Sequence, residues 1–206
     1  MYLVIKKYCE NETVINKSRF ICTIGRATSK EKAEEFIKTV TKNYYNATHN
    51  CFAYIIGEDH LIQKASDDGE PSGTAGIPML EVLKKHNLTD TVCVVTRYFG
   101  GIKLGTGGLI RAYGNAVSEA IKKSGINQIK PVQIIEIEFD YAQTGLIDNK
   151  LSNYNVINKL YLEKVFYTYQ IEVDKVQSFI DYLINITNNN ISYSLKDMDT
   201  CEINYA

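Results

Sequence analysis

The chain has 206 residues, of which 45% are hydrophobic and 23% charged, and its formal net charge is −1. This hydrophobic content is sufficient for a packed core, so the composition excludes a disordered chain. No apolar run is long enough to span a membrane and the N-terminus lacks a signal-peptide pattern, so we expect a cytoplasmic protein with no membrane partner. The five cysteines are odd in number and include no C-x-x-C pair, which predicts buried reduced thiols and disfavours a zinc site or a disulfide framework.

Charge is distributed unevenly along the chain. Residues 1–128 carry 17 basic and 13 acidic side chains, whereas residues 129–206 carry 6 basic and 11 acidic ones. This change of sign predicts two domains, 1–128 and 129–206, joined by a linker over 127–131. A site for a polyanion is expected in the first domain, because the second would repel it.

The first domain mixes short strands with helices. Apolar patterns predict six strands, over 5–9, 13–16, 20–25, 50–57, 61–65 and 91–99. Helical spacing predicts one helix after the capping box Thr28-x-x-Glu31, a second over 74–86 and a third with apolar residues from 109 to 121. The third helix is expected to end at Ser124-Gly125, because glycine is a common helix stop.

The second domain has a simpler pattern. Strands are predicted over 132–139, 155–160, 165–173 and 191–203, and the helices between them begin at the capping pairs Asp140-x-x-Gln143 and Asp174-x-x-Gln177. The resulting order, β-α-β-β-α-β, is typical of a ferredoxin-like fold. Its loops contain no phosphate-binding signature and its strand ends hold no catalytic cluster. We therefore interpret it as a structural or partner-binding module whose edge strand accepts a protein partner.

The most informative segment is VCVVTRYFGGIKLGTGGLIRAY over 92–113, which predicts a buried strand, a loop with five glycines and the start of a helix. Glycines allow close approach to backbone N–H groups, and a helix N-terminus attracts anions. Thr106 after Gly105 does not match the P-loop, and Ile110 replaces the third glycine of the dinucleotide motif, so no cofactor is predicted. Two interpretations remain, anion binding or a tight strand-to-helix connection. The candidate anion- or RNA-binding residues are Arg97, Tyr98, Gly100, Gly101, Lys103, Gly105, Thr106, Gly107, Gly108 and Arg111.

A second loop, DDGEPSGTAG over 67–76, contains three carboxylates and two hydroxyls. It can be interpreted as a Mg²⁺ site or, equally well, as a turn followed by a helix N-cap. A third interpretation is that the loop pairs with Arg97 or Arg111 and positions them. A nucleophilic triad of Ser72, His49 and Asp67 is a minor alternative, because the sequence has no G-x-S-x-G elbow. We assign no catalytic and no metal-binding residue, and expect the site to be shaped by His49, Asp67, Asp68, Glu70, Ser72 and Thr74.

Four blocks of the sequence resemble the signature blocks of the IMPACT/YigZ family: KSRFI over 17–21, ATHNC over 47–51, DDGEPSGTAG, and the segment 94–111. The resemblance covers roughly residues 1–125 with specific motifs and extends more loosely over the rest. It implies an α+β protein whose first domain is a two-layer α/β sandwich, similar to a small-subunit ribosomal protein and to the fourth domain of elongation factor G. It also implies a ferredoxin-like second domain, similar to the fifth domain of that factor.

The resemblance also implies a class of function. Eukaryotic members regulate translation by blocking activation of an amino-acid-starvation kinase through a scaffold protein, and they carry an additional N-terminal RWD domain. This chain shows no such domain, so it is similar to the bacterial stand-alone form. Our leading hypothesis is a non-enzymatic regulatory factor that binds RNA or the ribosome through the basic glycine-rich loop. The alternatives are a metal-assisted hydrolase acting on a phosphorylated small molecule or nucleotide, and a protein-interaction module working through the second domain.

Overall fold

The computed structural model describes residues 1–205, which form two compact units. Unit 1 comprises Met1–Gln128 and the end of the chain from Ile203, and unit 2 comprises Ile129–Glu202. The segment predicted as the linker, residues 127–131, contains the boundary between the two units, and it is extended backbone within the long strand β7 (Ile126–Phe139). Proline has a backbone φ that is compatible with extended structure, so Pro131 does not interrupt the strand.

Unit 1 is built on an antiparallel sheet with the strand order β2-β3-β6-β4-β5. Its strands are β2 (Cys9–Ile15), β3 (Ser18–Arg26), β6 (Thr91–Tyr98), β4 (His49–Ile56) and β5 (Ile62–Ser66). A further strand, β1 (Tyr2–Ile5), does not belong to this sheet: it pairs with β7, and Leu3 also forms an isolated bridge to Leu88. β6 lies at the centre of the sheet and is buried on both faces from Thr91 to Arg97, as its continuous apolar run predicts.

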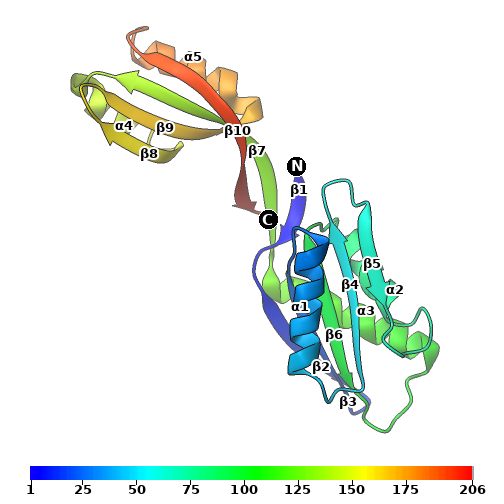
Figure 1. The fold of residues 1–206 in the computed structure, drawn as a ribbon. Helices are drawn as coiled ribbons and strands as arrows, with labels where there is room; N and C mark the ends of the chain where they lie inside the picture. Colours follow the sequence, from blue (N-terminus) through cyan, green and yellow to red (C-terminus); the bar gives the residue numbers. More distant parts are fainter. Residues whose placement is uncertain (206) are drawn as a thin grey trace. The chain divides into compact units, whose positions relative to one another are not determined.

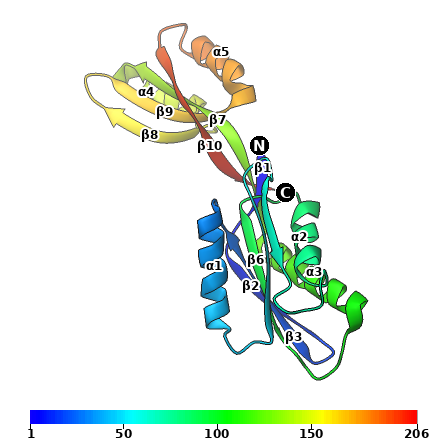
Figure 2. The same ribbon diagram turned by 45° about the vertical axis from the view of Figure 1, so that its right-hand side comes forward.

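Helices cover both faces of this sheet (Figures 1 and 2). The helix α1 (Lys30–Asn43) packs on one face, and α2 (Gly76–Lys85) and α3 (Gly105–Ser124) pack on the other. Alternation along β4 serves both layers, since Ala53 and Ile55 join the core under α2 and α3 while Tyr54 joins the core under α1. The unit is an α/β sandwich as predicted, with one layer more than the two that were expected.

The helix ends follow local sequence with small shifts. The N-cap of α1 is Ser29, whose side chain accepts from the Lys32 N–H, so the cap lies one residue after the predicted Thr28. Gly125 ends α3 at φ +77°, a left-handed value that glycine adopts without strain. α2 begins at Gly76, two residues later than predicted, and the N–H groups of Ala75 and Gly76 are capped by a side chain from outside the helix.

Unit 2 has the predicted ferredoxin-like order. Its elements are β7, the 3₁₀ turn η1 (Tyr141–Gln143), α4 (Thr144–Lys150), β8 (Asn155–Tyr161), β9 (Val165–Glu172), the 3₁₀ turn η2 (Val173–Lys175), α5 (Val176–Ile186) and β10 (Ser192–Asn204). β9 and β10 flank β7, and β8 pairs with β9. Asp140 and Gln143 form the predicted capping box, whereas α5 begins without a side-chain cap from Asp174. None of the helices in residues 1–205 has the length and hydropathy of a membrane span.

Candidate functional site

Asp67 holds the acidic loop in place. Its carboxylate accepts hydrogen bonds from the backbone N–H groups of Gly73 at 2.8 Å, Ala75 at 3.0 Å and Gly76 at 2.9 Å. Burial alone would raise the pKa of Asp67, but the three N–H donors outweigh it and lower that pKa below its ordinary value. Asp67 therefore caps the start of α2 from nine residues upstream. The predicted cap from Ser72 or Thr74 is absent, and the Thr74 hydroxyl donates to the Pro71 carbonyl instead.

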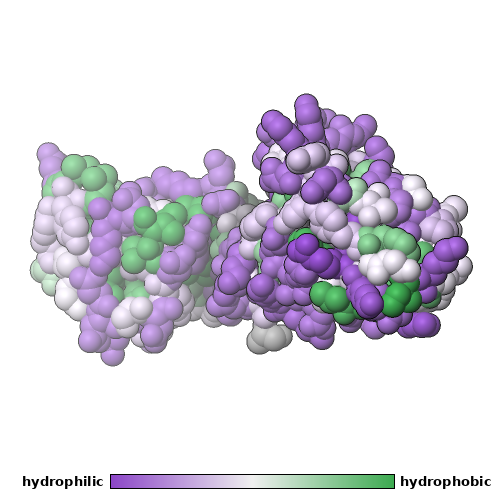
Figure 3. Space-filling view, turned by 90° about the horizontal axis from the view of Figure 1, so that it is seen from below, coloured by the Kyte–Doolittle hydropathy of each residue, from purple (hydrophilic) through white to green (hydrophobic). Residues whose placement is uncertain are grey.

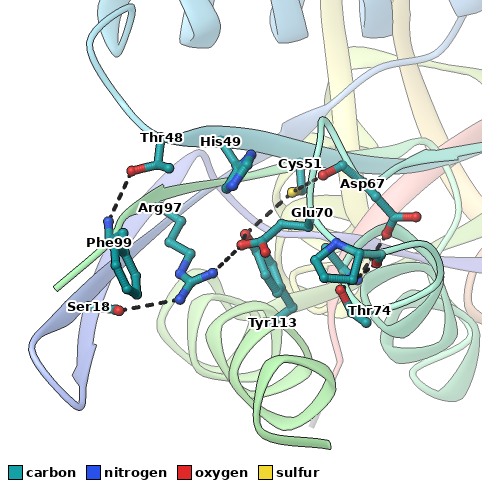
Figure 4. Close-up of polar contacts among 12 residues, drawn as sticks. Ser18, Thr48, His49, Cys51, Asp67, Glu70, Thr74, Arg97, Phe99 and Tyr113 are labelled. Atoms are coloured by element: carbon teal, nitrogen blue, oxygen red, sulfur yellow. Dashed lines mark hydrogen bonds and ion pairs between the residues drawn. The ribbon is translucent and has the colours of Figure 1, made fainter. Parts of the chain in front are cut away.

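Glu70 reaches across to the glycine-rich segment. Its carboxylate is buried and accepts from Arg97 Nη1 at 2.5 Å and from the Tyr113 hydroxyl at 2.8 Å (Figure 4). The two loops therefore meet, and the acidic residue that pairs with a predicted cation is Glu70. Cys51 lies beside this network and donates to the Asp67 carbonyl. Burial raises the pKa of the Cys51 thiol to about 12, so the thiol stays protonated at neutral pH and is a poor nucleophile.

The Arg97 guanidinium is enclosed by aromatic rings as well as by Glu70. Its central carbon lies 5.3 Å from the centre of the Phe20 ring and 5.5 Å from that of Phe99. The residue is only 5% exposed, and its buried Nε has no hydrogen-bond partner. The sequence alone predicts that Arg97 contacts a phosphate directly. Its burial and its pairing with Glu70 make it a residue that joins the two loops and supports Phe99.

The third carboxylate of the acidic loop, that of Asp68, and the His49 ring also have hydrogen-bond partners within the protein. Asp68 Oδ2 accepts from the Asn50 N–H at 2.6 Å, and the Asp68 carbonyl contacts His49 Nδ1 at 2.7 Å. The three carboxylates of the loop thus point to separate partners and do not converge. Within residues 1–205 no cluster of three or more His, Cys, Asp or Glu side chains has the geometry to hold a metal ion. His49 contacts Asp68 rather than Asp67, so the triad alternative has no geometric support.

The glycine loop is tightly fixed at its start and open further on. A Cβ on Gly100 would lie 2.1 Å from the Lys17 carbonyl carbon, so only glycine fits against this backbone. The Ser18 hydroxyl accepts from the Gly100 N–H at 3.2 Å, and the Thr48 hydroxyl accepts from the Phe99 N–H at 3.0 Å. Gly101, by contrast, has φ +82° and no neighbouring atom within 4 Å of a built Cβ.

A pocket of about 410 Å³ lies where the two loops meet. The acidic loop contributes Glu70 and Pro71, and the glycine-rich segment contributes Arg97, Phe99, Lys103, Leu104, Gly105, Thr106 and Leu109. α3 begins here at Gly105 without a side-chain cap, and Lys103 is exposed beside it. Figure 3 views unit 1 from the end at which this loop lies, and small apolar patches interrupt its hydrophilic surface. Phe99 lines the pocket and is 47% exposed, so part of its apolar ring faces solvent.

Several of the predicted residues do not line this pocket. Tyr98 follows Arg97 in β6 and so points to the opposite face of the sheet, where its hydroxyl donates to Asn46 and Arg19 lies over its ring. Arg111 lines a neighbouring pocket of about 680 Å³ together with Ile15 and Asn16. Gly107 and Gly108 lie in the first turn of α3, and Ser72 is exposed on the acidic loop.

The candidate site residues predicted from the sequence do not include four participants: Ser18, Cys51, Phe99 and Tyr113. Period-two alternation in β6 was the available signal for one of them, because Cys93, Val95, Arg97 and Phe99 share one face. Helical spacing along α3 places Tyr113 on the same face as Leu109 and Ala116, but the sequence interpretation gave it no role.

These features define an α+β protein of two units with one polar network and one glycine-rich loop at the N-terminus of α3. The family model of the Impact N-terminal domain matches residues 16–121. The chain is 50% identical over 189 residues to IMPACT family member YvyE of Bacillus subtilis (strain 168), covering 91% of this chain and 87% of the relative. It is 34% identical over 181 residues to IMPACT family member YigZ of Escherichia coli (strain K12), covering 86% and 89%. A crystal structure described as a hypothetical protein matches with a TM-score of 0.61 and 31% identity, covering 95% and 97%. The chain therefore belongs to the IMPACT family.

Proposed function

We propose that this protein is a translation-associated regulatory factor that binds RNA or the ribosome through the glycine loop of unit 1. The observation that carries the proposal is the uncapped start of α3, which opens onto the 410 Å³ pocket beside the exposed Lys103. Free N–H groups at a helix N-terminus are suited to a phosphate, and nearby cations strengthen that attraction. The family's eukaryotic members, which regulate translation, support the same class of function.

The exposed cations flank the first turn of α3 on two sides. Lys103 lines the pocket shared with Glu70, whereas Arg111 lines the pocket beside Asn16, and Leu104 borders both. A nucleic-acid backbone crossing the turn would meet both charges. Phe99, supported from below by the Arg97 guanidinium, offers an exposed ring on which an unpaired base can stack.

Salt dependence tests this proposal. The protein and a Lys103→Ala/Arg111→Ala variant are compared by fluorescence anisotropy with labelled RNA and by co-sedimentation with ribosomes, each over a salt series. Loss of two phosphate contacts should lower the slope of log affinity against log salt by about 2. The matched control is Lys84→Ala/Lys85→Ala at the end of α2, which removes the same charge elsewhere in unit 1. Affinity that is independent of salt, or lost equally in both variants, contradicts the proposal.

The hydrolase alternative loses support from the geometry of the acidic loop. Asp67 is engaged by three backbone N–H groups, Asp68 by Asn50, and Glu70 by Arg97 and Tyr113. Each carboxylate would have to abandon a protein partner to ligate a metal. Isothermal titration with Mg²⁺ tests this directly, and we expect no heat beyond dilution.

A protein partner of unit 2 is a second candidate function. All seven residues of the edge strand β8 are exposed, and Val156, Ile157 and Leu160 give it an apolar character. Such an edge can pair with a strand of another protein. Placing a charge there with Leu160→Lys should weaken ribosome co-sedimentation if a ribosomal protein docks on this edge. An unchanged profile would remove this candidate and leave the glycine loop as the proposed contact.

A further inference from the structure

A groove on the other face of the unit 1 sheet is not used by the proposed glycine-loop site. α1 packs against β3, β6 and β4, and the edge strand β5 extends beyond it. The space between α1 and β5 is a groove of about 610 Å³, which we term the α1–β5 groove. It lies on the α1 face, whereas the glycine-loop pocket is built from α3 and the acidic loop that precedes α2.

Aromatic side chains form much of this groove. Phe52 and Tyr54 project from the same face of β4, with ring centres 6.5 Å apart and ring planes only 7° from parallel. Tyr54 is buried, and Phe52 is half-buried, so the groove has a firm aromatic floor. Tyr45 stands at its end, just beyond α1, and is 84% exposed. A tyrosine so exposed contributes little to folding and is available for contact with a ligand.

Basic side chains form its rim. Lys38 and Lys42 lie one turn apart on α1, and Lys64 on β5 places its Nζ 5.8 Å from the centre of the Phe52 ring. In residues 1–205 none of these three lysines forms a salt bridge, and each lines the groove. Like charges at i and i+4 on a helix oppose each other, so this arrangement costs a little stability.

The acidic side chain at the groove does not cancel this charge. Glu34 lines the groove but pairs with Lys30, at 3.9 Å, on the preceding turn of α1. The groove therefore combines a net positive rim with flat apolar rings. That combination matches a ligand in which negative groups alternate with planar rings, as phosphates and bases alternate in a nucleic acid strand.

We propose that the α1–β5 groove binds unpaired nucleotides of single-stranded RNA, with bases stacked on Tyr45 and Phe52 and phosphates held by Lys38, Lys42 and Lys64. A duplex does not fit this chemistry, because its bases are already stacked on one another and cannot reach the rings. An acidic peptide would satisfy the lysines but leave the rings without planar partners. The inference deepens the proposed function, on which it rests for the class of partner, and adds a second contact that is independent of the glycine loop.

The test uses the full chain with two fluorescein-labelled probes, an unstructured oligouridine and an RNA duplex of the same length. Tyr45→Ser removes the exposed ring, and we expect it to weaken oligouridine binding about ten-fold while leaving duplex binding unchanged. Lys38→Gln/Lys42→Gln should lower the slope of log affinity against log salt for oligouridine by about 1.4, since each phosphate contact on a single strand contributes about 0.7. Lys84→Gln/Lys85→Gln is the matched charge control, and thermal unfolding confirms that each variant is folded.

The outcomes separate this inference from the glycine-loop proposal. If the groove variants bind oligouridine as the unmodified protein does while Lys103→Ala/Arg111→Ala loses binding, the groove inference is wrong and the glycine loop stands. If only the groove variants lose binding, the groove stands and the glycine-loop proposal is wrong. Binding of the duplex alone, binding of neither probe, or displacement of oligouridine by polyglutamate as efficiently as by unlabelled RNA would each overturn the groove inference.

Discussion

The two glycine-bearing loops of unit 1 meet at one pocket, yet their polar groups are disposed in opposite ways. In the acidic loop the carboxylates of Asp67 and Glu70 are turned inward and engaged by protein donors. In the glycine loop, Lys103 is turned outward and the start of α3 has no side-chain cap. A cluster of charged residues in a sequence can therefore be part of the scaffold rather than of a binding site. The glycine loop has fewer charged residues, but its Lys103 and the N–H groups at the start of α3 are available to bind a ligand.

This difference between the two loops predicts how substitutions in each loop change the free energy of unfolding. Residues of the acidic loop should matter for folding, because removing one partner leaves a buried polar group unsatisfied. The exposed residues of the glycine loop should matter little for folding and more for binding.

The largest effect is expected for Glu70→Gln. The change keeps the shape of the side chain but leaves the buried Arg97 guanidinium without its counter-charge, which should lower the free energy of unfolding by about 3–5 kcal/mol. Urea unfolding measures this loss. The double variant Glu70→Gln/Arg97→Met removes both charges and should recover most of it, since the penalty comes from the unpaired cation. A double variant as unstable as the single one would mean that the pair itself stabilises the junction.

A smaller effect is expected at the start of the glycine loop, where two adjacent glycines differ. In Gly100→Ala the new Cβ would collide with the Lys17 backbone, so the strand end must shift, at a cost of about 2–3 kcal/mol. Gly101→Ala meets no neighbouring atom and should cost about 1 kcal/mol for its positive φ. Thermal unfolding of the two variants checks the order. Equal losses would show that the close approach of Gly100 to the β2–β3 turn adds no constraint.

The sequence predicted much of this unit because its strongest signals are local. The continuous apolar run of β6 identified the central strand, and Gly125 marked the end of α3. The family resemblance was confirmed by the match to the Impact N-terminal domain. Alternation in β6 also contained the information that Arg97 and Tyr98 face opposite sides, although the sequence interpretation treated them as neighbours in one site.

What the sequence did not predict depends on long-range partners. Nothing local to Asp67 says that its carboxylate caps a helix rather than binds a metal, because that depends on how the loop folds back on α2. In the same way, an arginine such as Arg97 is normally expected to be exposed to solvent. Its burial arises from Glu70, Phe20 and Phe99, which are far from one another along the chain. The segment expected as a linker is continuous with a strand, because extended backbone tolerates Pro131.

Acid should weaken the cap formed by Asp67. The folded-state pKa of Asp67 lies below its unfolded value, so its contribution to stability is present above the unfolded pKa of about 3.9 and is lost as the pH falls toward the folded pKa. Asp67→Asn should be less stable than the unmodified protein at pH 7, by about 2 kcal/mol, because the neutral amide caps α2 poorly. Thermal unfolding at several pH values between 7 and 3 compares the two proteins.

The difference between those two melting temperatures should shrink as the pH falls below about 4, because the carboxyl group of the unmodified protein becomes neutral as well. Other carboxylates titrate in both proteins and cancel in the difference. A gap that stays constant down to pH 3 would mean that the Asp67 charge does not contribute to the cap.

The smallest effect on stability is expected for Lys103→Ala/Arg111→Ala. Both side chains are exposed and neither forms a salt bridge within residues 1–205, so the free energy of unfolding should change by less than about 0.5 kcal/mol. The melting temperature should accordingly shift by no more than about 2–3 °C. A large fall would place these cations in the scaffold with Glu70 and Asp67, and the contrast between the two loops would then be wrong. A small shift together with weakened RNA binding is the combination that a scaffold role cannot produce, because a residue that only supports the fold changes binding by changing stability.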